Sequence, residues 1–146
     1  MCTPHSTLEI VQNRFTSWHS QEKKLKERLF LDYVEHKISK LHPKATVIKT
    51  DDHIRFISAI NLTEISLFPI WREGIKDVKK ELAEDIDRAI GLLRSNMHKN
   101  IYLLYPKSET LAKHIDIKSK ELEDGTSTLK IIPYKLCESF RSKLSF

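Results

Sequence analysis

The sequence predicts an α/β fold in which a central mixed sheet of about five strands is flanked by helices. Three observations support this prediction: two long apolar stripes at helical spacing, three closely spaced strand-like runs between them, and two more strand-like runs after the second stripe. The close spacing favours an antiparallel meander, and the strand, long helix and strand that follow indicate a right-handed crossover. We expect residues 1–146 to form a single domain.

The first forty residues are expected to contain two helices. The first begins after a cap at Ser6 or Thr7, and the run 17–20 interrupts it, so residues 1–19 are expected to be an N-terminal helical appendage. Its apolar residues at helical spacing are Leu8, Val11, Phe15 and Trp18. The second helix, about 21–41, has one apolar face and ends before Pro43.

Three strand-like runs follow the second helix, at 45–50, 53–60 and 62–71. They are rich in β-branched residues, and turn residues separate them. Pro69 marks the end of the third run or the edge of the sheet. This part of the chain therefore predicts the antiparallel meander.

The second half of the chain predicts a long helix at about 75–97, which has a near-heptad apolar stripe. The strand 101–105 is apolar throughout, as in a central strand that is covered on both faces. Ser108 is expected to cap a helix that runs to about Lys120. The strand 128–132 is expected at a sheet edge, where it can pair with a partner strand, and the tail ends in a helical turn or two.

Composition and charge limit the function. The net charge is +5, and the first fifty residues hold nine basic and five acidic side chains, which favours a polyanionic partner, DNA rather than RNA. The chain has no glycine-rich phosphate loop, no recognisable signal peptide and no apolar run of 18 residues, so we expect no membrane association. Cys2 and Cys137 fit no zinc spacing and indicate a cytoplasmic protein, with Cys137 expected to be buried.

Three carboxylates form a candidate metal site. Asp51 and Asp52 lie where the first strand turns into the second, and Glu64 lies in the third strand. Two carboxylates on neighbouring antiparallel strands can share Mg²⁺ or Mn²⁺, which activates water for phosphodiester cleavage. In the alternative interpretation, the two aspartates only form a turn and Glu64 faces solvent.

This arrangement resembles the PD-(D/E)XK, restriction-endonuclease-like superfamily. Residues 21–105 follow the family's order of a helix, a three-stranded meander, a helix and a strand, and 102–106 is similar to the strand that ends the family core. The resemblance implies a metal-dependent endonuclease or a non-catalytic relative that binds DNA or RNA. It also implies that Asp52 (or Asp51) and Glu64 are the acids that bind the metal and act in catalysis.

The chain departs from the family pattern at the lysine. The pattern E-x-K is replaced by Glu-Ile-Ser, with Ser66 at the position of the lysine. The resemblance therefore implies that Lys79 or Lys80, on the next helix, stabilises the developing charge. The acid that the family has on its first helix would be Glu22 or Glu27.

Basic side chains form a candidate nucleic-acid-binding surface at the start of the second helix, at Lys23, Lys24, Lys26 and Arg28. Such side chains can contact phosphates without reading the base sequence. The alternative is a solvated helix face, because Glu22 and Glu27 are interleaved with them. Two further hypotheses stay open: a ribonuclease-H-like protein, which also needs clustered carboxylates, and a non-enzymatic interaction protein or homodimeric accessory protein.

Overall fold

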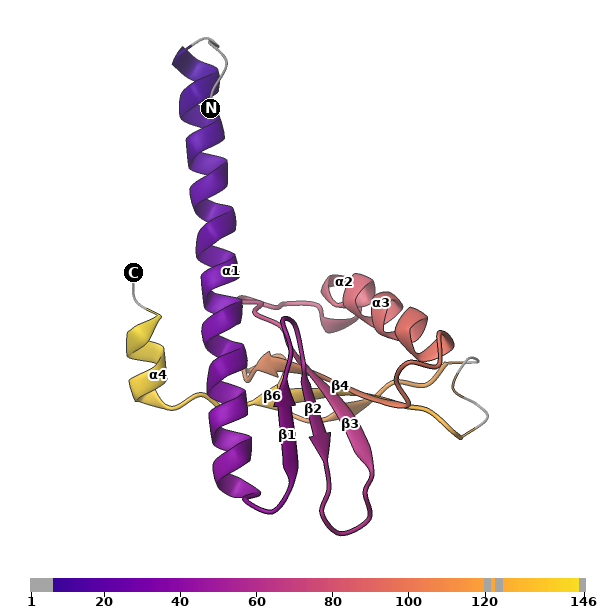
Figure 1. The fold of residues 1–146 in the computed structure, drawn as a ribbon. Helices are drawn as coiled ribbons and strands as arrows, with labels where there is room; N and C mark the ends of the chain where they lie inside the picture. The colour runs from indigo at the N-terminus through magenta and orange to yellow at the C-terminus, as the bar shows by residue number, and fades with distance from the viewer. Residues whose placement is uncertain (1–6, 120–121, 123–124, 145–146) are drawn as a thin grey trace.

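The protein is built around a six-stranded mixed sheet. The computed structural model describes residues 7–119, 122 and 125–144. The strands are β1 (Thr46–Lys49), β2 (Ile54–Ile57), β3 (Glu64–Pro69), β4 (Asn100–Pro106), β5 (Ile115–Asp116) and β6 (Thr128–Tyr134). The helices are α1 (Thr7–Leu41), α2 (Val78–Glu81), α3 (Ala83–Arg94) and α4 (Glu138–Lys143). Helices α1 and α4 pack on one face of the sheet, and α2 and α3 on the other (Figure 1).

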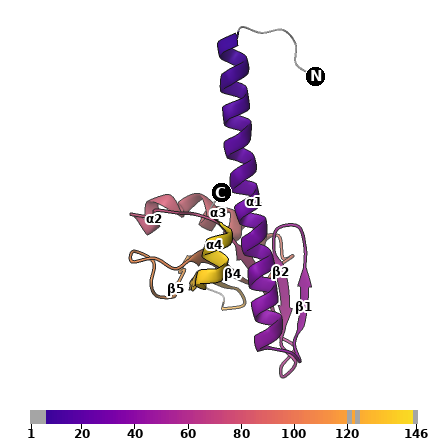
Figure 2. The same ribbon diagram turned by 90° about the vertical axis from the view of Figure 1, so that its left-hand side faces the viewer.

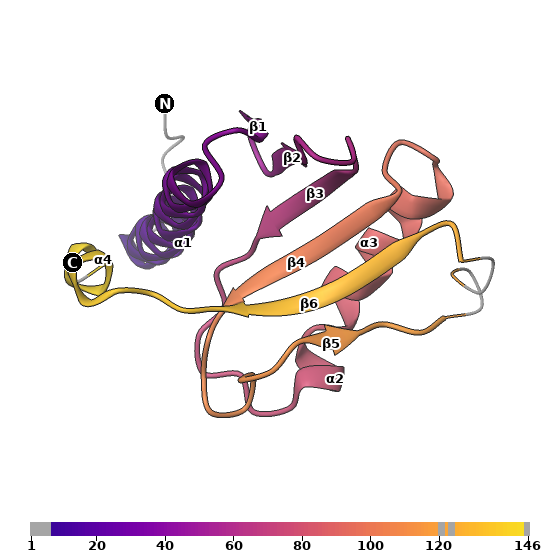
Figure 3. The same cartoon turned by 90° about the horizontal axis from the view of Figure 1, so that it is seen from below.

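The strands lie in the order β1-β2-β3-β4-β6-β5 (Figure 3). β1, β2 and β3 form the predicted antiparallel meander. β3, β4 and β6 are parallel, and β5 is antiparallel to β6. The α/β class and the mixed sheet are therefore confirmed, with six strands in place of about five.

The additional strand, β5, occupies a segment for which the sequence predicts a helix. Ser108 Oγ accepts a hydrogen bond from Leu111 N at 3.2 Å, as in a helix cap, but only a short bend follows. Ile115 then pairs with β6, and Ile117 N donates to a β6 carbonyl at 3.0 Å. Both isoleucines pack against the core, and this burial and pairing outweigh the helical pattern. The helix prediction is wrong here, although its expected end, Lys120, lies outside the described residues.

The placement of β5 also changes the position of β6. The strand predicted at 128–132 lies between β4 and β5, so it is an interior strand and not an edge. β1 and β5 are the outermost strands of the sheet.

α1 runs without a break from Thr7 to Leu41, so the two helices predicted on either side of 17–20 are one. Serine and histidine cost a helix only about 0.5 kcal/mol each relative to alanine, and this run has no glycine or proline to stop it. The 35 residues make a helix about 52 Å long. Its N-terminal half stands clear of the sheet, whereas its C-terminal half packs on it (Figures 1 and 2).

The long helix predicted at 75–97 is shorter and divided. The Asp77 side chain accepts a hydrogen bond from Lys80 N and caps α2, and α3 begins after Leu82. Asn96 has a left-handed φ of 60°, which ends the helical path, and Met97 is therefore 79% exposed and not part of the apolar stripe.

Two hydrophobic clusters, one on each face of the sheet, form the core, and β4 separates them. Ile101, Leu103 and Tyr105 belong to the cluster under α3, and Leu104 belongs to the cluster under α1. All four are at most 3% exposed, which confirms that the strand predicted at 101–105 is central and covered on both faces. In the part of α1 whose side chains the structure describes, 21–41, the buried hydrophobic residues are Phe30, Leu31 and Val34.

Candidate functional site

The two acids predicted to share a metal ion lie at opposite ends of β2 and β3. Asp52 lies in the turn before β2, two residues before Ile54, which is paired with Leu67 near the end of β3. Glu64 is paired with Ile57 at the other end of the hairpin. The antiparallel register therefore does not bring Asp52 and Glu64 together.

Each of these acids also has a protein partner of its own. Asp52 Oδ1 lies 2.7 Å from His53 Nδ1 and accepts a hydrogen bond from Thr50 Oγ1 at 3.4 Å. Glu64 is hydrogen-bonded to Arg55 Nε in an ion pair. Among the side chains that the structure describes, those of residues 21–119, 122 and 125–144, no group of three or more His, Cys, Asp or Glu is placed to hold a metal ion. These residues do not fit the Mg²⁺ or Mn²⁺ ion that the resemblance implies, nor the carboxylate cluster of a ribonuclease-H-like site.

The other residues suggested for catalysis are also separated from Asp52. Lys79 and Lys80 lie in α2, where both are exposed, and neither lines the cavity that contains Asp52. Ser66, at the position of the family lysine, is 4% exposed, and its Oγ lies 2.8 Å from His98 Nδ1. The serine is therefore part of a buried polar contact.

A second histidine adjoins this contact. The His53 ring stacks on Phe68 with centroids 4.8 Å apart, and the His98 ring meets His53 edge-on at 5.4 Å. Burial, and then the nearby His53, lower the pKa of His98 below its ordinary value. No local sequence pattern predicts a role for His98, because Ser66 and His53, which it contacts, lie far from it in the sequence.

A cavity of about 440 Å³ lies where β3 ends, between α1 and α3; we call it the edge cavity. β3 and β4 are parallel, and the carboxyl edge of parallel strands is where α/β proteins commonly bind ligands. The structure brings several predicted residues together here. Its charged lining residues are Lys24, Glu27, Arg28, Asp51, Asp52, Asp85 and Arg88.

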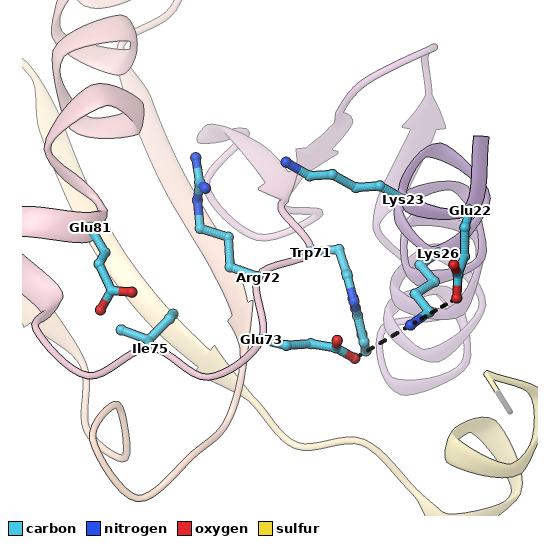
Figure 4. Close-up of a pocket in the computed structure, with 8 residues that line it drawn as sticks. All are labelled: Glu22, Lys23, Lys26, Trp71, Arg72, Glu73, Ile75 and Glu81. Atoms are coloured by element: carbon cyan, nitrogen blue, oxygen red, sulfur yellow. Dashed lines mark ion pairs between the residues drawn. The ribbon is translucent and has the colours of Figure 1, made fainter. Parts of the chain in front are cut away.

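A second cavity, of about 690 Å³, lies beside the first, between α1 and the segment that joins β3 to α2. We call it the Trp71 cavity, and Figure 4 shows the residues that line it. Predicted residues reach this cavity from α1, namely Glu22, Lys23 and Lys26. The four basic residues of the predicted nucleic-acid-binding surface are thus divided between two adjacent cavities.

A buried polar contact connects the two cavities. Arg72, which lines the Trp71 cavity, donates two hydrogen bonds to Asp85 at 2.8 and 3.0 Å. Asp85 lines the edge cavity and also accepts a hydrogen bond from Tyr105 Oη at 2.9 Å. Burial raises the pKa of Asp85, but the hydrogen bonds from Arg72 and Tyr105 outweigh burial and hold that pKa below its ordinary value.

Sequence reasoning missed this contact, although one signal was present. Asp85 lies on the apolar face of the helix, between Leu82 and Ala89, and all three side chains are buried. A charged residue within an apolar stripe requires a buried partner. The pattern could have identified Asp85, but not Arg72 or Tyr105 as its partners.

Cys137 is exposed, so the prediction that it is buried is wrong. It precedes α4, and its Sγ lies 3.1 Å from Ser139 Oγ. Hydrogen bonds with Ser139, with Tyr33 and with the backbone of Phe140 lower the pKa of the thiol to about 7.

Comparisons with family models, curated proteins and solved structures find no match for the chain. Among the described residues, no helix is both long enough and apolar enough to cross a membrane.

Proposed function

We propose that the protein is a non-catalytic, nucleic-acid-binding relative of the restriction-endonuclease-like fold, with DNA as the preferred partner. One observation carries this proposal. Four basic side chains of α1 line the two cavities at the carboxyl edge of β3: Lys23, Lys24, Lys26 and Arg28. Side chains placed in this way can follow a phosphate backbone without reading the bases.

The lining of the edge cavity carries both signs of charge. Asp85 is paired with Arg72, so the three cations of the lining face its three other carboxylates. The proposal therefore depends on Lys24 and Arg28, which are exposed on α1 and can turn to a phosphate, and not on a net positive charge of the cavity.

The order of the helices and strands supports the proposed relationship to the restriction-endonuclease-like fold. α1, the meander β1–β3, the helices α2 and α3, and β4 follow the order that the resemblance implies. The ion pair of Glu64 with Arg55 and the register of β3 favour binding over metal-dependent cleavage.

The test is a fluorescence anisotropy titration of labelled single- and double-stranded DNA and RNA at several salt concentrations. We expect the double variant Lys24→Glu/Arg28→Glu to bind DNA about tenfold or more weakly, because it removes two cations and adds two repulsive charges at the cavity. The slope of log affinity against log salt should fall by about 0.9 for each phosphate of double-stranded DNA that the variant no longer neutralises.

A matched control separates a local site from net charge. Lys40→Glu/Lys44→Glu makes the same change of charge at exposed positions near the other end of α1 and should bind almost as the natural chain does. Equal losses of affinity in both variants, or no binding at low salt, would contradict the proposal. Cleavage that depends on Mn²⁺ and stops with chelator would contradict the proposal that the protein is non-catalytic. It would support the nuclease hypothesis instead.

A second candidate function, self-association through α1, is favoured by the length of that helix. Its N-terminal half stands clear of the sheet (Figure 2). An isolated helical segment of this length is only marginally stable in water. Leu25, which is 44% exposed, continues the heptad spacing of Phe15 and Trp18 in the sequence. A second copy of α1 would cover such a stripe as in a coiled coil.

Light scattering on the full chain tests the second candidate. A dimer has twice the chain mass of 17.1 kDa, and Val11→Glu/Phe15→Glu should return it to a monomer by placing charges on the stripe. The control, Gln12→Glu/Thr16→Glu, adds the same charges one position away and should leave the dimer intact. A natural chain that is monomeric at micromolar concentration would exclude this function.

A further inference from the structure

The Trp71 cavity contains a buried donor that has no acceptor among the described residues. Trp71 is 6% exposed, and its indole Nε1 lies out of reach of solvent without a hydrogen-bond partner. An indole N–H can only donate. The ring is held in place by an edge-on contact with Phe30, with centroids 5.7 Å apart, so it cannot easily turn to find an acceptor within the protein.

The other donors of this cavity are also in excess. Lys23 forms no ion pair within the described part of the chain, and Asp85 binds Arg72 only through Nε and Nη2, so Nη1 remains a donor for a ligand. One nearby acceptor is already in use, because the Glu81 carboxylate accepts hydrogen bonds from two backbone N–H groups at 2.6 and 2.7 Å.

The remaining carboxylates share one lysine. Lys26 Nζ lies 3.7 Å from both Glu22 and Glu73, which is a loose distance for an ion pair. Figure 4 shows the indole ring of Trp71 extending from the β3–α2 segment toward the Lys26–Glu73 pair. The Glu73 side chain is 62% exposed, so it can move away at little cost.

We propose that the Trp71 cavity binds a small organic oxyanion, a phosphate ester or a carboxylate, whose oxygen displaces Glu73 from Lys26. Trp71 Nε1 is covered in the structure without a ligand, and in this proposal the movement of Glu73 uncovers it so that the oxygen accepts its hydrogen bond. Lys23 and Arg72 contribute further positive charge, and the indole ring and Ile75 supply an apolar wall. The volume of about 690 Å³ lies within the range of small-molecule sites. This inference does not rest on nucleic-acid binding, although Lys23 and Lys26 belong to both proposed surfaces.

The test is a titration observed by NMR on the full chain. The chain has two tryptophans, so two indole N–H resonances are expected, and the variant Trp71→Phe assigns one of them to Trp71. The probes are adenosine monophosphate, succinate and inorganic phosphate. We expect a saturable downfield shift of the Trp71 indole resonance with the first or the second probe, and the one that binds more tightly identifies the ester or the carboxylate.

Two variants then test the exchange of Glu73 for the ligand by calorimetry. Trp71→Phe should weaken binding about tenfold, because one buried hydrogen bond is removed while the aromatic packing on Phe30 is kept. Glu73→Gln should strengthen binding several-fold, because the competing carboxylate is removed. Glu138→Gln, at an exposed position in α4, makes the same chemical change at a residue that does not line the cavity and should have no effect.

Several outcomes would overturn the inference. They are an indole resonance that does not move with any probe at millimolar concentration, equal affinities of Trp71→Phe and the natural chain, and weaker binding by Glu73→Gln. Binding of inorganic phosphate alone, without a shift of the indole resonance, would show a general attraction to anions and would also contradict the site. DNA binding is tested with Lys24→Glu/Arg28→Glu in the edge cavity, and ligand binding with Trp71→Phe and Glu73→Gln in the Trp71 cavity, so either proposal can fail without the other.

Discussion

Replacing Phe30 by alanine is expected to lower the free energy of unfolding by about 4 kcal/mol. Phe30 is fully buried at the centre of the cluster between α1 and the sheet. Its ring meets Trp71 and Tyr134 edge-on, with centroids 5.7 and 6.2 Å apart. The substitution removes the buried ring, its two aromatic contacts and the packing of the surrounding side chains, and urea unfolding followed by circular dichroism measures the loss of stability.

Leu41→Ala is the control on the same helix. Leu41 is 64% exposed, so its truncation should change the free energy of unfolding by no more than about 0.5 kcal/mol. The two substitutions together test whether the region of α1 around Phe30 belongs to the core. A loss of stability below about 1 kcal/mol for Phe30→Ala would mean that α1 does not pack on the sheet through this residue.

Asp85→Ala is expected to cost about 3 kcal/mol at pH 7. The carboxylate is almost completely buried, and its removal leaves the Tyr105 hydroxyl and part of the Arg72 guanidinium without their acceptor. Asp87→Ala, at an exposed position of the same helix, should cost little. Equal effects of the two substitutions would show that the contact with Arg72 adds no stability.

The cost of Asp85→Ala should depend on pH in a defined direction. The folded-state pKa of Asp85 lies below its ordinary value, so its carboxylate adds stability above about pH 4, the usual pKa of an aspartate. This contribution disappears as the pH falls through the lower folded-state pKa. The difference between the natural chain and Asp85→Ala should therefore shrink in acid, and unfolding measured at pH 7 and pH 3 checks this.

Local patterns predicted most of the fold because most elements bury one periodic face. In the helix 21–41, the meander and the strand 101–105, the spacing of the apolar residues within each segment predicts which face is buried. The exceptions depend on tertiary contacts. Ile115 and Ile117 join a sheet through β6, and nothing in their own neighbourhood shows that this strand lies beside them.

The candidate site was less predictable, since it depends on register and on distant partners. The spacing of Asp52 and Glu64 is compatible with neighbouring strands, but only the pairing of Ile57 with Glu64 shows that they lie at opposite ends. Lys24 and Arg28 could be selected from the sequence because they cluster there. Arg72 belongs to no such cluster in the sequence. It is part of the site because it donates hydrogen bonds to Asp85, which lies thirteen positions away.

The position of β4 has a consequence for the way the chain folds. The pairings of β1, β2 and β3 join neighbouring segments, so they close short loops at small entropic cost. β4 can pair with β3 only after the intervening chain with α2 and α3 has been brought across the sheet, and β6 must then find β4. Contacts of this length slow folding, so we expect the meander to form early and the docking of β4 to limit the rate. Since β4 belongs to both hydrophobic clusters, its docking would complete the two halves of the core in a single cooperative step.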